Sequence, residues 1–168
     1  MADTGQPATE TVAPGEVIPK EVFMADAREI GAKFVEAFNA HDEARIRELH
    51  GENVVFEGPG DVKLEGREPA VLYAMSWLRA FPDARLTVTN EVAAGDWVVQ
   101  ECTFEGTHED TLASPGGDIA ATHKRVKGRS VSIFKVEGGV MTEIRLYFDQ
   151  VQLMTQLGLM PQPATTTA

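Results

Sequence analysis

The spacing of apolar residues changes near Phe81-Pro82-Asp83, and this change limits the folds open to the chain. Before it, apolar residues recur every three to four positions, which predicts helices with one buried face. After it, they alternate with polar residues over long stretches, which predicts strands. Helices followed by a run of strands are typical of an α+β domain, in which the helices pack on one face of a sheet. The 168 residues are enough for one such domain.

The first half of the chain predicts three helices and one short strand. The helices are expected over residues 24–40, 42–50 and 69–80, with Asp42 as the N-cap of the second helix. Between the last two helices, Val54-Val55-Phe56 predicts a short strand, which ends at the turn Gly58-Pro59-Gly60-Asp61.

The second half predicts four strands and a closing helix. The strands are expected over residues 85–93, 97–106, 124–136 and 140–148, and the helix begins near Asp149 and ends at Gly158. Such a meander is expected to be antiparallel, and if it curves around the helices it leaves a cavity.

The two ends of the chain differ from this body in composition. Residues 1–22 hold three prolines among Thr, Glu, Gly and Ala, and residues 162–168 are of the same kind. We expect a disordered leader over 1–22, one domain over 23–161 and a disordered tail over 162–168.

The charge of the chain excludes several kinds of partner. With 26 acidic residues against 15 Lys and Arg, the net charge of −11 repels phosphate backbones and anionic lipid, so neither nucleic acid nor a membrane is expected as a partner. The short basic cluster Lys124, Arg125, Lys127 and Arg129 has no interleaved aromatic residues and is interpreted as a solvated hairpin.

The sequence gives no sign of export. The first residues lack the basic and apolar regions of a signal peptide, and a cytoplasmic location is expected. The single cysteine, Cys102, lies in a strand pattern and is interpreted as a small, inert core residue.

Five short segments carry a resemblance to a known family. In chain order they are Phe34–Asn39, Ala80–Asp83, Gly106–His108, Tyr147–Asp149 and Gln156–Gly158. Together they resemble the SnoaL-like polyketide cyclases of the nuclear transport factor 2-like superfamily, over residues 24 to 160. The resemblance implies a cone-shaped barrel, in which a curved antiparallel sheet wraps around N-terminal helices and a C-terminal helix follows. It also implies an apolar pocket and, often, a homodimer.

The same resemblance implies a chemistry and the walls of a site. Cyclases of this kind need no cofactor: an acid/base removes a proton beside a carbonyl group of an apolar substrate, and the pocket stabilises the enolate. The expected pocket walls are Phe34, Phe38, Tyr73, Trp77 and Leu146.

One position departs from the pattern of the relatives. They carry an Asp three residues before the position of Asp149, and here that residue is Leu146. Alternation along 140–148 also places Leu146 on an apolar face with Thr142, Ile144 and Phe148, so the usual catalytic acid is expected to be missing.

Four other residues are candidates for the acid/base role, and each has a second interpretation. Asp149 is either the N-cap of the last helix or an acid at the pocket rim, and Glu101 is either a pocket acid or a residue on the open face of the sheet. Glu57, in the first strand, has the same two interpretations as Glu101. The Gly58 that precedes Pro59 stands where ketosteroid isomerases carry a catalytic Asp, which argues against isomerase chemistry. His108 either donates a hydrogen bond to a carbonyl group or fixes the loop after it.

The other histidines give no sign of a metal centre. His41 and His50 flank the second helix and are expected at the surface. Because no pair of histidines has the spacing His-x-His or His-Glu-x-x-His, no metal is expected, and without a glycine-rich phosphate loop no cofactor is expected either.

Three functions remain open at this point. The first is a cofactor-independent ester or polyketide cyclase, the second a non-catalytic binding protein for a small hydrophobic ligand, and the third, with weaker support, an epoxide hydrolase. A homodimer is also predicted, because Glu143, Arg145 and Tyr147 give the outer face of the last strand a mixed polar and aromatic character.

Overall fold

A computed structural model describes residues 20–114 and 116–160, with side chains from residue 27 onward. Residues 1–19 and 161–168, which hold most of the expected leader and all of the expected tail, lie outside the described part. The elements are α1 (Lys20–Asn39), α2 (Glu43–Leu49), β1 (His50–Gly58), β2 (Val62–Glu65), α3 (Arg67–Ala80), β3 (Arg85–Ala94), β4 (Trp97–Thr107), β5 (Arg125–Glu137), β6 (Val140–Phe148) and α4 (Gln150–Gln156). The order of helices and strands is the one expected for an α+β fold.

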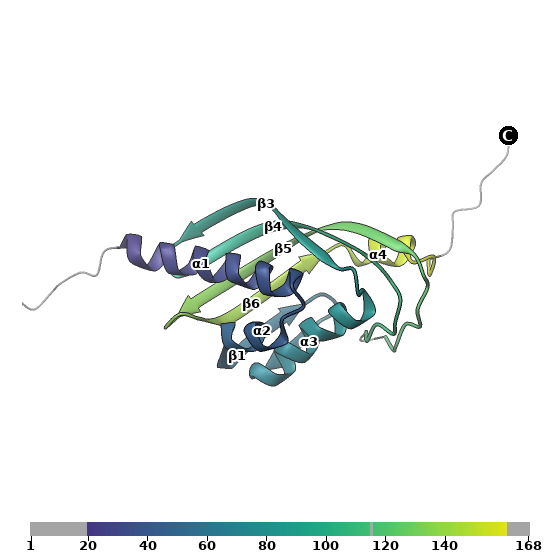
Figure 1. Ribbon diagram of the computed structural model, residues 1–168, viewed down its shortest axis with the longest axis horizontal. Coiled ribbons are helices and arrows are strands. Elements are labelled where there is room, and N and C mark those ends of the chain that lie inside the picture. Colours follow the sequence, from purple (N-terminus) through teal and green to yellow (C-terminus); the bar gives the residue numbers. More distant parts are fainter. Residues whose placement is uncertain (1–19, 115, 161–168) are drawn as a thin grey trace, which may run out of the picture.

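The strands form one six-stranded sheet in the order β2-β1-β6-β5-β4-β3. The meander β3 to β6 is antiparallel as predicted. The sheet differs from the expectation at one pair, because β1 runs parallel to β6. It also keeps two edges, β2 and β3, and therefore curves without closing into a barrel (Figure 1).

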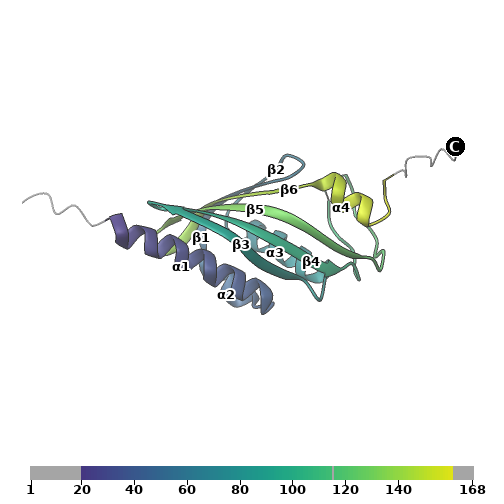
Figure 2. The same cartoon turned by 90° about the horizontal axis from the view of Figure 1, so that it is seen from above.

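The first three helices cover one face of the sheet. Figure 2 shows α1, α2 and α3 on the same side, while α4 follows the end of β6 and packs beside the first residues of β5. α1 contacts β3, β4 and β5, and α3 contacts β1 and β2. The core between these layers consists of buried apolar side chains, among them Phe38, Ile46, Leu78, Phe81, Val98 and Phe134.

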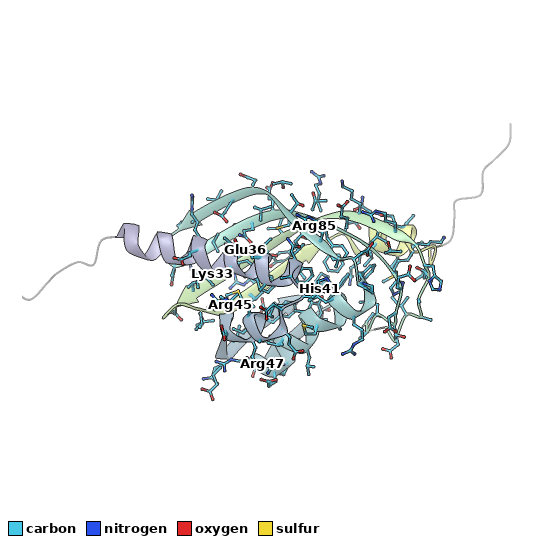
Figure 3. The ribbon with its side chains drawn as sticks, in the orientation of Figure 1. Lys33, Glu36, His41, Arg45, Arg47 and Arg85 are labelled. Carbon is cyan, nitrogen blue, oxygen red and sulfur yellow. The ribbon has the colours of Figure 1, made fainter. Side chains whose placement is uncertain are left out.

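Polar side chains occupy the opposite sides of α1 and α2. Glu36 of α1 is exposed, and Arg45 and Arg47 of α2 form ion pairs with Glu48, Glu43 and Glu68 (Figure 3). At the start of α2, the Arg45 backbone N–H donates to Oδ1 of Asp42 at 2.9 Å. The predicted N-cap is thus confirmed.

A β-bulge sets which residues of β6 face the helices. The pairs Lys135↔Glu143 and Val136↔Met141 leave Thr142 without a partner in the ladder. Met141 is consequently buried in place of Thr142, whereas Ile144, Leu146 and Phe148 face the helices as predicted.

Two boundaries differ from the sequence analysis. Strand β2 was not predicted, because four residues with only Val62 and Leu64 apolar give a weak alternation signal. Helix α1 begins at Lys20, inside the expected leader. Within residues 20–114 and 116–160, no helix has the length and apolar character needed to span a bilayer.

Candidate functional site

A cavity of about 120 Å³ lies between the sheet and the helices that cover it. Its wall is largely apolar and includes all five residues expected there, Phe34 and Phe38 from α1, Tyr73 and Trp77 from α3, and Leu146 from β6. The amphipathic faces of two helices and the alternation of one strand are what turn these side chains toward a common space.

Aromatic rings form much of this wall. Phe34 and Phe134 have ring centroids 5.5 Å apart, Phe56 and Tyr73 are 4.5 Å apart, and Trp77 lies edge-on to Phe148 at 5.4 Å. Tilted and edge-to-face pairs of this kind are mutually stabilising and present CH edges and ring faces to the cavity. The wall therefore suits a compact apolar or aromatic molecule.

The charged and amide side chains of the wall come together at one end of the cavity. They come from the start of β5 and from α4 and the residue before it, and they are Lys127, Arg129, Asp149, Gln152 and Gln156. The other end holds His50, which pairs with Met141 at the start of β6. Asp149 lies eight residues further along the chain, or about 25 Å at strand rise. His50 and Asp149 therefore cannot act on the same atom of a small ligand.

Asp149 has the geometry of a helix N-cap and also lines the cavity. Its Oδ1 accepts a hydrogen bond from the Gln152 backbone N–H at 2.9 Å, which confirms the capping prediction. The same helix is held to β5 by the Gln156 side chain, which accepts from the Lys127 N–H at 2.7 Å and donates to the Lys127 carbonyl at 2.9 Å. Both interactions fix the mouth of the cavity.

Glu101 does not reach the cavity, and this corrects the proposed pocket role. The buried residues of β4 nearest to Glu101 are Val98, Gln100 and Cys102, so Glu101 lies on the other face of the sheet and is exposed. The Thr89 hydroxyl donates to its backbone carbonyl. Of its two interpretations, the structure fits the open sheet face.

Glu57 does not line the cavity either. It is exposed on β1 and pairs with Arg145 at 3.7 Å, and it lines a separate, open hollow of about 460 Å³ beside the β1–β2 turn. Arg145 also pairs with Glu143 and lies 5.3 Å from the centroid of the Trp97 ring. This cluster belongs to the outer face of the sheet.

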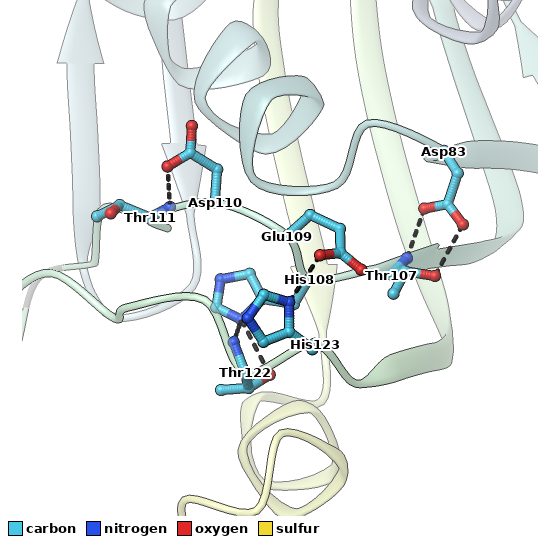
Figure 4. Close-up of polar contacts among 8 residues, drawn as sticks. All are labelled: Asp83, Thr107, His108, Glu109, Asp110, Thr111, Thr122 and His123. Carbon is cyan, nitrogen blue, oxygen red and sulfur yellow. Dashed lines mark hydrogen bonds and ion pairs between the residues drawn. The ribbon is translucent and has the colours of Figure 1, made fainter.

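His108 is fully buried in the loop after β4. The Thr122 backbone N–H donates to Nδ1 of its ring at 3.3 Å (Figure 4). The His108 backbone N–H donates to the Lys124 carbonyl, and the His108 carbonyl accepts from the His123 backbone N–H. Its ring stacks on Phe81 at 5.1 Å and is not part of the cavity wall. Burial lowers the pKa of His108. These contacts fit the interpretation that His108 anchors the loop.

His50 is a wall residue that the sequence analysis missed, and its expected place at the surface is wrong. Its exposed fraction is 2 %, and its ring meets Phe34 edge-on at 5.9 Å. Burial lowers the pKa of His50, and the nearby positive charge of Arg67 lowers it further. Alternation along β1 could not have placed this residue, because Glu52 has the same parity as His50 and Val54 but is exposed, and the pairing with β6 shifts register between His50 and Val55. His41, by contrast, is exposed as predicted.

No group of three or more His, Cys, Asp or Glu in the described part of the chain is placed to hold a metal ion.

Several solved structures are similar to this chain. A proposed SnoaL-like polyketide cyclase from Jannaschia sp. CCS1 has a TM-score of 0.73 and 19 % identity, covering 94 % of this chain and all of that one. IdmH from Streptomyces antibioticus, a proposed polyketide cyclase, has a TM-score of 0.66 and 26 % identity over 79 % of this chain and 98 % of that one. An LEH-like epoxide hydrolase from M. tuberculosis has a TM-score of 0.63 and 19 % identity, covering 80 % of this chain and 90 % of that one.

Comparison with curated proteins finds no match. The family of SnoaL-like polyketide cyclases matches residues 29–157, which is most of the chain and includes every element from α2 to β6. The five segments noted in the sequence fall within or at the edge of this range. The chain therefore belongs to the SnoaL-like polyketide cyclase family.

Proposed function

We propose that this protein is a cofactor-independent enzyme of the cyclase type, which closes a ring in an apolar carbonyl compound by acid/base chemistry. The observation that carries the proposal is Asp149: among the described residues that line the cavity, it is the one carboxylate. The family and the aromatic wall support an apolar substrate.

The proposed reaction is an intramolecular aldol closure. The Asp149 carboxylate removes a proton from the carbon beside one carbonyl group, and the enolate carbon attacks a second carbonyl carbon of the same molecule. The new C–C bond leaves an alkoxide, which takes the proton back from Asp149. The hydroxyl groups of Ser130 and Tyr73, both in the cavity wall, are the candidate donors to the developing oxyanion.

Leu146 favours a second function, a binding protein without catalysis. It occupies the position where relatives are expected to carry the acid, and it faces the cavity, so the described residues give the middle of the wall no carboxylate. Hydrolysis of an epoxide has less support, because it requires water activated between paired acids and the described wall holds Asp149 alone.

Turnover and binding measured on the same samples separate the first two functions. Polyketide-ester model substrates test ring closure, and displacement of a fluorescent apolar probe tests occupation of the cavity. In Asp149→Asn we expect binding within twofold of the parent and turnover reduced by at least a hundredfold, since an amide cannot carry the proton.

Glu101→Gln is the matched control, because it makes the same change of chemistry on the outer face of the sheet. We expect it to match the parent in both assays. Saturable binding by the parent without turnover of any substrate would replace the cyclase proposal with the binding function. Full turnover by Asp149→Asn would refute the role of Asp149.

A further inference from the structure

The tautomer of His50 follows from one contact. Its Nδ1 lies 2.7 Å from the carbonyl oxygen of Ile46, one turn earlier in α2. A carbonyl oxygen only accepts, so Nδ1 must carry the hydrogen and donate it. In a neutral imidazole the other nitrogen, Nε2, then holds a lone pair and is an acceptor.

The neutral form is the one that the surroundings favour. The Arg67 Nε donates to the His50 backbone carbonyl at 2.8 Å, which places a guanidinium beside the ring, and the ring itself is buried among apolar groups. Both effects oppose a second positive charge. No carboxylate of the described residues contributes to the pKa of His50.

Nε2 is the atom of this ring left for a ligand. Among the described residues, none forms a hydrogen bond with Nε2 of His50. Two buried side-chain atoms of the described residues are fully enclosed without a partner, Gln100 Oε1 and His108 Nε2. Because Nε2 of His50 is not one of them, it is accessible. Since His50 belongs to the cavity wall, the accessible atom faces the cavity. Its neighbours in the wall, Phe34 and Phe134, are apolar.

We propose that His50 Nε2 accepts a hydrogen bond from a hydroxyl group of the ligand, and so selects compact apolar molecules that carry a phenol or alcohol at the inner end. An acceptor in an apolar wall favours a donor and disfavours a carbonyl oxygen or carboxylate, which would leave two acceptors facing each other. The inference rests on the proposed use of this cavity as a ligand site, and is independent of catalysis by Asp149.

Phenol and toluene form a suitable pair of probes, because they have nearly the same size and differ in the hydroxyl group. The cavity of about 120 Å³ is comparable with an engineered apolar cavity of about 150 Å³ that holds benzene. The measured quantity is the ratio of the Kd for toluene to the Kd for phenol, obtained by calorimetry on the full chain.

Two variants separate the acceptor from the fold. His50→Asn keeps a donor near the position of Nδ1, within reach of the Ile46 carbonyl, and removes the acceptor at the position of Nε2, because its own carbonyl oxygen ends short of that point. His50→Gln places an amide near the position of Nε2. We expect the Kd ratio to fall about tenfold in His50→Asn, the size of one hydrogen bond, and to recover in part in His50→Gln. Because the ratio compares two ligands in the same protein, a change in cavity volume cancels.

A direct readout needs no variant. In long-range ¹H–¹⁵N spectra of the parent, His50 is expected as the Nδ1–H tautomer, with an Nε2 resonance that moves on addition of phenol and stays unchanged with toluene. An Nε2–H tautomer, or an unchanged Kd ratio in His50→Asn, would overturn the inference. Failure of both probes to bind the parent would instead refute the cavity as a ligand site, and with it both proposals.

Discussion

Replacing Asp149 by Ala should lower the stability of helix α4 at the mouth of the cavity, because it removes the N-cap of that helix. The substitution removes the hydrogen bond from the Gln152 N–H to Oδ1, a capping interaction worth about 1 kcal/mol. Helix α4 has no fully buried residue between Gln150 and Gln156, and its packing on the core rests on the half-buried Leu153 and on Leu157, which is buried directly after the helix. The two hydrogen bonds between Gln156 and Lys127 are its other described tie to β5.

The assay should resolve α4 separately from the whole domain. A loss of about 1 kcal/mol corresponds to roughly fivefold faster amide exchange at Gln152 if the helix opens locally. If instead α4 opens only with the domain, the Tm should fall by about 2–4 °C. Asp149→Asn should stay close to the parent in both measurements, since Asn caps about as well as Asp.

The reasoning fails if Asn and Ala lose equal protection, because the carboxylate would then matter through its charge and not through capping. Gln156→Ala serves as a reference, since it cuts the other tie of α4 and leaves the cap intact. Exchange at Gln152 that is unchanged in Asp149→Ala would show that the described hydrogen bond contributes nothing to holding the helix.

Three further predictions test burial and assembly. Burial lowers the pKa of both His50 and His108, so as the pH falls the unfolded state takes up protons before the folded state does. The free energy of unfolding should therefore be constant above about pH 6.5 and fall below it. Urea melts over this pH range should show a smaller fall for His50→Asn than for the parent. Burial, and to a lesser extent the negative charge of Glu91, raises the pKa of Cys102 from 9.0 to about 11. A thiol reagent at pH 8 should therefore react about a hundredfold more slowly with the native protein than with the urea-unfolded protein. Equal rates would contradict the burial of this thiol. We also propose a homodimer through the outer face of β6, where Tyr147 is 54 % exposed and stands in the same strand as Glu143 and Arg145. Sedimentation at micromolar protein that shows only an 18.3 kDa species would exclude it.

Much of this fold is local in origin and could be predicted. The alternation of Leu86 and Val88 with polar residues, and the turns at Gly95 and Gly138, define β3 to β6 within a few residues, because each signal lies inside the element that it describes. The caps Asp42 and Asp149 were equally local, and both form the expected hydrogen bonds.

The parts that could not be predicted depend on contacts between distant segments. Nothing within β1 indicates that it pairs with β6 in parallel, and this pairing is what turns His50 into a wall residue. Glu101 was ambiguous because β4 has apolar residues on both faces, Val98 and Cys102 on one and Val99 on the other, so its pattern does not say which face is inside.

The parallel pair of β1 and β6 has a consequence for how the chain folds. Strand β1 leaves the ribosome early, whereas its parallel partner β6 is among the last segments to be made. The paired residues Phe56 and Ile144 are some 90 residues apart in the chain. Until then β1 has only the four-residue β2 beside it, and an isolated two-stranded hairpin is marginal in water. A nascent chain or a fragment that ends before Val140 thus exposes the apolar edge of β1, and strand addition between such chains is the expected route of aggregation.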